Sequence, residues 1–125
     1  MKYLVDTCGW IEWFTEGKLI DNFAPFLIDP GQLIVPTLLQ YELYKWVSRE
    51  KGADVALEIV GITESGNVVY LDTNLAIYAA DLAQDFQLSM ADAVIYATSR
   101  RYEVELITSD QHFKGLPHVQ YFKKK

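Results

Sequence analysis

The sequence predicts an α/β fold, a three-layer α/β/α sandwich with a mainly parallel central sheet. Short apolar runs alternate with stretches long enough to form helices along the whole chain. Strands separated by helices favour parallel pairing, with helices on both faces of the sheet. The chain contains no internal repeat, low-complexity segment or linker. We therefore expect one domain over residues 1–125, a usual domain size.

Five strands are expected. The first includes Tyr3-Leu4-Val5, and three consecutive apolar residues indicate a strand buried on both faces. The third contains the β-rich run Val68-Val69-Tyr70. The expected strands are residues 2–6, 33–36, 67–71, 105–108 and 119–122.

The stretches between the strands are expected to be helical. Thr37 and Gln40 have the spacing of a capping box at the start of the helix that follows the second strand. A Ser65-Gly66-Asn67 turn ends the helix before the third strand. The expected helices are residues 9–14, 22–28, 37–49, 52–63, 73–86 and 89–102.

The composition is that of a globular protein, with 50% hydrophobic, 14% aromatic and 22% charged residues. Cys8 is the single cysteine, which excludes an intrachain disulfide. Neither a secretory signal nor an apolar run of about 18 residues is recognisable, so we expect a cytoplasmic protein without a membrane span.

The formal net charge of −6 gives nucleic-acid binding no support, because phosphate backbones attract basic surfaces. Bound divalent cations would offset part of a clustered acidic site. The basic residues form local groups, which are interpreted first as solvated faces or tails. These groups are Lys45, Arg49 and Lys51; Arg100 and Arg101; and Lys123, Lys124 and Lys125.

Two aspartates follow apolar strands. Asp6 comes after Leu4-Val5, and Asp110 ends the run Leu106-Ile107-Thr108-Ser109-Asp110. Ligands of open α/β sheets bind outside the carboxyl ends of the strands, where both side chains should lie. The alternatives are a helix N-cap for Asp6 and a simple turn residue for Asp110.

Two further acids lie on helices that are otherwise apolar. Glu42 falls on or beside the core-facing stripe of its helix, and Asp92 interrupts the apolar segment from Met90 to Ala97. A buried carboxylate must be paired, protonated or bound to a metal. The alternatives are a salt bridge from Glu42 to Lys45 and a capping box between Ser89 and Asp92.

The joint placement of these acids is stronger than any one of them. Gathered carboxylates repel one another unless a counter-ion is present, and Mg²⁺ or Mn²⁺ favours carboxylate ligands. His112 and His118 are too few for a histidine-based zinc site, and no phosphate-binding glycine loop occurs. Aromatic residues at helical spacing are interpreted as core rather than base-stacking platforms. They are Trp10, Trp13, Phe14 and Trp46.

At this point four segments closely resemble the PIN-domain family, and within it the VapC-type toxins of toxin–antitoxin pairs. They are Leu4-Val5-Asp6-Thr7; Gln40-Tyr41-Glu42-Leu43; Met90-Ala91-Asp92-Ala93-Val94-Ile95-Tyr96-Ala97; and Thr108-Ser109-Asp110-Gln111-His112-Phe113. The match covers nearly the whole chain. It departs from the family at Cys8, where Ser or Asn is frequent, and at His112, where some members carry another acid.

The resemblance implies a metal-dependent endoribonuclease that binds Mg²⁺ or Mn²⁺ in an acidic pocket. It implies further a cognate VapB-like antitoxin, whose segment covers the site, and a homodimer. By the same resemblance Thr7 and Thr108 support the pocket. Its catalytic and metal-binding residues would be Asp6, Glu42, Asp92 and Asp110.

Two other classes of protein stay open from the sequence. One is a PIN-like module that binds RNA or a protein without cutting it. The other is a receiver-like domain, in which Asp72 would accept a phosphoryl group, although no second acid neighbours Asp6 and the acids at 42 and 92 go unexplained.

Overall fold

The computed structural model describes residues 2–124, so Met1 and Lys125, the last residue of the basic tail, lie outside the described residues. All strand pairs are parallel over this range. One sheet has the order β1-β4-β5 and a second has the order β2-β3, and a parallel bridge between Tyr3 and Leu33 joins them. The strands are β1 (Tyr3–Val5), β2 (Ile34–Pro36), β3 (Asn67–Val69), β4 (Glu105–Thr108) and β5 (Val119–Tyr121).

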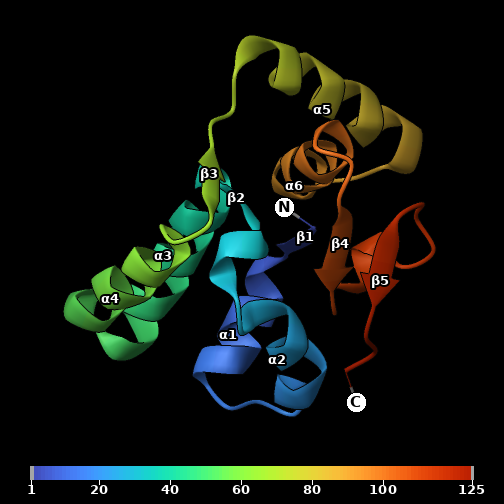
Figure 1. Ribbon diagram of the computed structural model, residues 1–125. Helices are drawn as coiled ribbons and strands as arrows, with labels where there is room; N and C mark the ends of the chain where they lie inside the picture. Colours follow the sequence, from blue (N-terminus) through green and yellow to red (C-terminus); the bar gives the residue numbers. More distant parts are fainter. Residues whose placement is uncertain (1, 125) are drawn as a thin grey trace.

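The helices lie on both faces of these strands, which confirms the predicted α/β class (Figure 1). In Figure 1, α6 covers one side, with α5 above it at the top of the view, and α1 and α2 cover the other. The helix α3 contacts both α1 and α6. The helices are α1 (Thr7–Phe14), α2 (Ile20–Leu27), α3 (Thr37–Lys51), α4 (Ala53–Thr63), α5 (Thr73–Phe86) and α6 (Met90–Arg101), with 3₁₀ turns η1 (Pro30–Gln32) and η2 (Gln111–Phe113).

The core lies between the sheet and these helices. Leu4 and Leu106, on neighbouring strands, are fully buried, as continuous apolar runs in a parallel sheet require. Gly9 is where α1 lies tight against the core, since a Cβ there would come within 2.6 Å of Phe23 and of Val5. This close approach brings the start of α1 directly onto the end of β1.

One sequence prediction about local structure is wrong. Thr37 does not cap α3, because Pro36 is the N-cap residue and Thr37 is already inside the helix. Gln40 is therefore not the partner of a capping box. Its side-chain amide donates to Thr63, the last residue of α4, and to Glu64, which follows it. Proline fixes its own φ near the value that an N-cap needs, so the strand-to-helix turn forms without a side-chain cap.

The other elements agree with the prediction within a few residues. The third strand is shorter than expected, because Tyr70 and Leu71 are exposed and lie beyond β3. Over residues 2–124, none of the helices is both long enough and apolar enough to cross a membrane.

Candidate metal centre

Asp6 lies at the carboxyl end of β1 and begins α1. Its Oδ1 accepts the backbone N–H of Thr7 at 2.8 Å, so the predicted N-cap role is confirmed. Its Oδ2 accepts the hydroxyl of Thr108 at 2.9 Å. The side chain is only 6% exposed, which is unusual for a cap. The capping role and a role in a buried acidic site are therefore compatible.

Thr108 joins Asp6 to Asp110. The parallel pairing of β1 with β4 places the carboxyl ends of these two strands side by side. They form the topological switch point, because β2 and β3 lie on one side of β1 while β4 and β5 lie on the other. The Thr108 hydroxyl donates to Asp6 and accepts the backbone N–H of Asp110 at 2.9 Å. Asp110 in turn caps η2, since its Oδ1 accepts the N–H of His112.

Glu42 reaches the same place from α3. Its Oε1 accepts the hydroxyl of Thr7 at 2.9 Å, so Thr7 donates to both Asp6 and Glu42. Lys45 acts on Glu42 only through its charge, as one of the weaker influences on the pKa of that carboxyl. The alternative of a surface salt bridge between Glu42 and Lys45 is not what fixes the position of this side chain.

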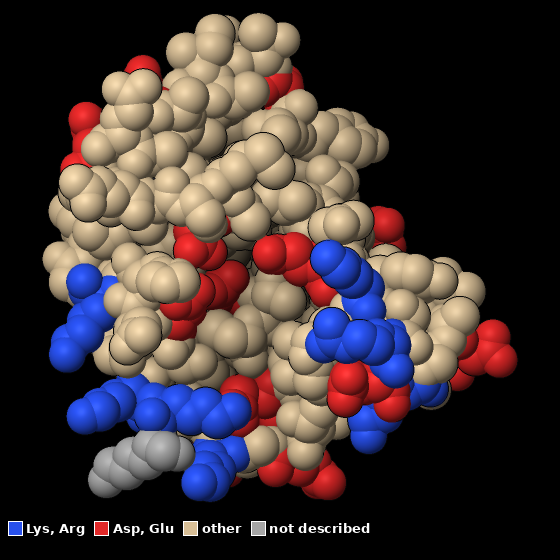
Figure 2. Space-filling model, turned by 180° about the vertical axis from the view of Figure 1, so that it is seen from behind, with Lys and Arg blue, Asp and Glu red and all other residues tan. Residues whose placement is uncertain are grey.

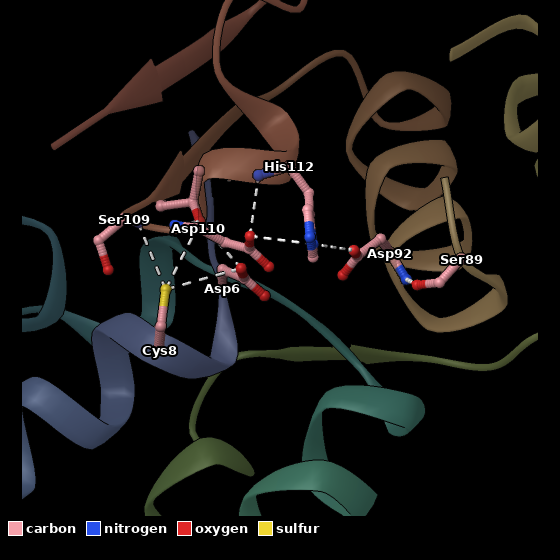
Figure 3. Close-up of polar contacts among 8 residues, drawn as sticks. Asp6, Cys8, Ser89, Asp92, Ser109, Asp110 and His112 are labelled. Carbon is pink, nitrogen blue, oxygen red and sulfur yellow. Dashed lines mark hydrogen bonds and ion pairs between the residues drawn. The ribbon is translucent and has the colours of Figure 1, made fainter. Parts of the chain in front are cut away.

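Asp92 enters from the first turn of α6. Its backbone N–H donates to the Ser89 hydroxyl at 3.4 Å, which confirms Ser89 as the cap. Its carboxylate instead faces the cluster, with Oδ2 at 3.1 Å from Nδ1 of His112 (Figure 3). The capping interaction thus positions the helix start, while the carboxylate stays available.

His112 lies between two of the acids. Its Nδ1 is 3.1 Å from Asp92 Oδ2 and 3.2 Å from Asp110 Oδ1. One ligand atom from each of Asp92, Asp110 and His112 lies within 4.8 Å of the others. The sequence alone marks His112 as a departure from the family and as one of only two histidines, not as a residue of the acidic site. Its position two residues after Asp110, in a turn that Asp110 caps, is the signal that would have placed it here.

Cys8 lies next to the cluster, below Asp6 and Ser109 in the view of Figure 3. Its Sγ lies 3.6 Å from Asp6 Oδ2 and 3.5 Å from Thr108 Oγ1, and it accepts the N–H of Ser109 at 3.4 Å. Burial, reinforced by the nearby Asp6 charge, raises the pKa of the Cys8 thiol to about 12. The thiol therefore stays protonated and links the first turn of α1 to the turn after β4.

Burial and the proximity of other acids raise the pKa values of three of the carboxyls. Burial raises the pKa of Asp6 from 3.8 to about 7, and the charges of Glu42 and Asp110 contribute to the rise. Burial also raises the pKa of Glu42, and the charges of Asp92 and Asp110 add to this. For Asp92 the causes of the raised pKa are burial and then the charge of Asp110. After burial, the charge of at least one other acid of the cluster contributes to each of these three shifts.

The site lies in a hollow of the surface. Figure 2 shows acidic side chains gathered around a depression near the middle of one face, with Lys and Arg side chains on both sides of it. The donors offered there are mainly carboxylate oxygens, which suit Mg²⁺ or Mn²⁺, with one imidazole nitrogen, a donor that these ions favour less. By the chemistry of its donors the site fits a hard divalent cation.

Asp72 lies elsewhere and is engaged differently. It caps α5 through the N–H of Leu75 and pairs with Arg101, whose Nη1 is 2.8 Å away. The Arg101 guanidinium lowers the pKa of this carboxyl. An aspartate held in this way serves the helix start and the ion pair, so the geometry does not favour a phosphoacceptor at Asp72.

The family model of the PIN domain matches residues 3–119, so this chain belongs to the PIN-domain family. Among solved structures it is similar to a toxin–antitoxin complex from Klebsiella pneumoniae, with a TM-score of 0.79, 22% identity, and coverage of 95% of this chain and 96% of that one. It is similar to VapBC2 from Rickettsia felis bound to a promoter DNA fragment, with a TM-score of 0.75, 15% identity, and coverage of 98% and 100%.

A third similar structure is VapC20 from Mycobacterium tuberculosis, a toxin that cleaves the sarcin–ricin loop, with a TM-score of 0.71, 14% identity, and coverage of 98% and 90%. No curated protein matches the sequence significantly. At these identities the structural similarity concerns the fold.

Proposed function

We propose that this protein is a Mg²⁺- or Mn²⁺-dependent endoribonuclease, the toxin of a type II toxin–antitoxin pair acting in the cytoplasm. The observation that carries the proposal is the meeting of Asp6, Glu42, Asp92 and Asp110 at the carboxyl edge of the sheet, with raised pKa values for the first three. The fold supports it, because similar structures include VapBC complexes and a toxin that cleaves an RNA loop.

The four carboxylates would hold the metal, and a bound divalent cation would supply an activated water and neutralise charge on the phosphate. Thr7 and Thr108 orient the acids, because their hydroxyls donate to Glu42 and Asp6. The Glu42 carboxylate, whose Oε1 accepts the Thr7 hydroxyl, would accept a proton from a water at the site. Nδ1 of His112 bridges the carboxylates of Asp92 and Asp110 and so helps to fix the separation between them.

Cleavage of RNA by the purified protein tests the proposal. We expect a structured RNA to be cut with Mg²⁺ or Mn²⁺ and left intact with EDTA. Asp6→Ala, Asp92→Ala and Asp92→Asn should each abolish cleavage and weaken Mn²⁺ binding measured by calorimetry. Asp85→Asn, which removes an equal charge from the exposed face of α5, should behave as wild type. Wild-type cleavage by either Asp92 variant would refute the four-carboxylate site.

The same measurements separate the alternative of a non-catalytic module. Such a protein would bind RNA with no cleavage at any metal concentration and no calorimetric signal for Mn²⁺. Heat from Mn²⁺ binding that disappears in Asp92→Asn favours the enzyme.

We propose a VapB-like antitoxin and a second copy of the chain as partners. The first is supported by similar structures that are VapBC complexes. The second is supported by an apolar hollow of about 490 Å³ whose lining includes the exposed residues Leu71 and Met90, and by Ile77, which is exposed on α5. Light scattering of the purified chain should give twice the monomer mass, and Ile77→Glu should lower it to the monomer.

A further inference from the structure

A second hollow opens directly beside the acidic site. It has a volume of about 290 Å³ and lies between α1 and α3, with Thr7 and Glu42 among its lining residues. Those two residues are joined by the 2.9 Å hydrogen bond already described, so the hollow and the acidic site share a wall. A ligand that spans the acids can therefore continue into this hollow.

Two cations follow Glu42 along the same face of α3. Lys45 and Arg49 line the hollow, three and seven residues after Glu42, which is the spacing of one helix face. At 1.5 Å per residue they lie about 4.5 Å and about 10.5 Å along the helix axis from Glu42. Among the described residues that line the hollow, Glu42 is the only acid. In a chain of net charge −6 this is a local reversal of sign.

Two aromatic rings complete the lining. Tyr41 is 59% exposed, and Trp46, which is half-buried and packs against the core, also lines the hollow. The Lys45 ammonium lies 5.9 Å from the centre of the Tyr41 ring. A cation beside an exposed ring is the arrangement that binds single-stranded nucleic acid, because the ring stacks on a base while the cation binds a phosphate.

We propose that this hollow is a nucleotide subsite, which holds the RNA residue next to the bond that is cut. Lys45 and Arg49 bind its flanking phosphates, and Tyr41 with Trp46 contacts its base. The inference rests on the proposed ribonuclease function and adds the direction of the strand: the RNA leaves the acids along α3. Arg49 can make this contact, since its pair with Glu50 is exposed and such pairs contribute little.

Binding of a short fluorescent single-stranded RNA, measured by anisotropy in EDTA over a range of salt, tests the subsite without any cleavage. Each contact between a cation and a phosphate contributes about 0.7 to the slope of log affinity against log salt. Lys45→Gln and Arg49→Gln should each reduce the slope by that amount. Tyr41→Ala should weaken binding about tenfold and leave the slope unchanged, because it removes stacking.

Lys2→Gln is the matched control. It removes the same charge, but Lys2 precedes β1 and therefore lies at the amino end of the sheet, opposite the acids. Its slope and affinity should equal those of the wild type. Lys45, Arg49 and Tyr41 are on the surface, so their variants should unfold at the wild-type temperature.

Cleavage kinetics distinguish this inference from the proposed function. The double variant Lys45→Gln/Arg49→Gln should raise KM at least tenfold with a smaller change in kcat, since it loses binding rather than chemistry. If the wild type cuts RNA but the two variants keep its salt slope and KM, the subsite is refuted while the nuclease stands, and the hollow is left for a protein segment. If the wild type never cuts, the proposed function fails, and the salt slopes still decide whether the hollow binds RNA.

Discussion

Replacement of Asp6 by asparagine tests whether the ionised Asp6 carboxylate lowers the free energy of unfolding of the metal-free protein. The pKa of Asp6 is raised from 3.8 to about 7 in the folded protein. Between these values the folded state keeps a proton that the unfolded chain has lost. The free energy of unfolding must therefore fall as pH rises through this window. Each pKa unit is worth about 1.4 kcal/mol, so the difference of about three units amounts to about 4 kcal/mol at most.

We expect urea unfolding in EDTA to show this loss between about pH 4 and pH 7 in the wild type. The asparagine side chain of the Asp6→Asn variant keeps an oxygen for the Thr7 N–H but carries no charge, so the variant should lose most of the pH dependence. A smaller decline should persist in the variant, because the pKa values of Glu42 and Asp92 are raised too. Equal pH dependence in wild type and variant would refute the argument that ionisation of Asp6 destabilises the folded state.

The same pair of proteins links stability to metal binding. Mn²⁺ binds the ionised carboxylate, so at about pH 8 it should stabilise the wild type by about 2.7 kcal/mol when present at a hundred times its Kd. Asp6→Asn should gain much less at the same concentration. An equal gain in both would show that Asp6 does not hold the ion.

Three further substitutions test the surroundings of the site. His112→Asp replaces a nitrogen donor by oxygen, so calorimetry should show tighter Mg²⁺ binding and weaker Ni²⁺ binding than in the wild type. Gly9→Ala should lower the free energy of unfolding by about 1–3 kcal/mol in urea, because its Cβ would collide with Phe23 and Val5; a neutral result would show that α1 can shift. Lys124→Gln should cost about 1–3 kcal/mol, because it removes the ion-pair partner of Glu12, which is 3% exposed; wild-type stability would refute that contribution.

Much of the fold follows from local sequence signals. The apolar runs around Leu4 and Leu106 predicted buried parallel strands, and the strands have the expected positions. The capping box predicted at Thr37 is wrong because either a side-chain cap or a proline at the N-cap position can start this helix. Pro36 already has the backbone conformation of a cap, so the hydroxyl of Thr37 was not needed. Capping spacing alone does not distinguish these solutions.

The candidate site was predictable in its acids and less so in its connections. Asp6 and Asp110 follow from the rule that parallel strands end at one edge, and Glu42 and Asp92 follow from a charge on an apolar helical face. The roles of Thr7 as a donor to two acids and of His112 as a bridge depend on contacts between distant segments. No periodicity records such contacts, so only the structure reveals them.

The hydrogen bonds of the site also explain why a bound cation would stabilise it. Thr7 and Thr108 satisfy carboxylate oxygens with neutral donors, which orient the acids but leave their charges in place. The pKa of Asp6 therefore stays near 7 despite two hydrogen bonds that lower it, because burial outweighs them. Only a proton or a cation removes the remaining repulsion. Above about pH 7 Asp6 loses its proton, and a divalent ion would then offset the repulsion among the acids.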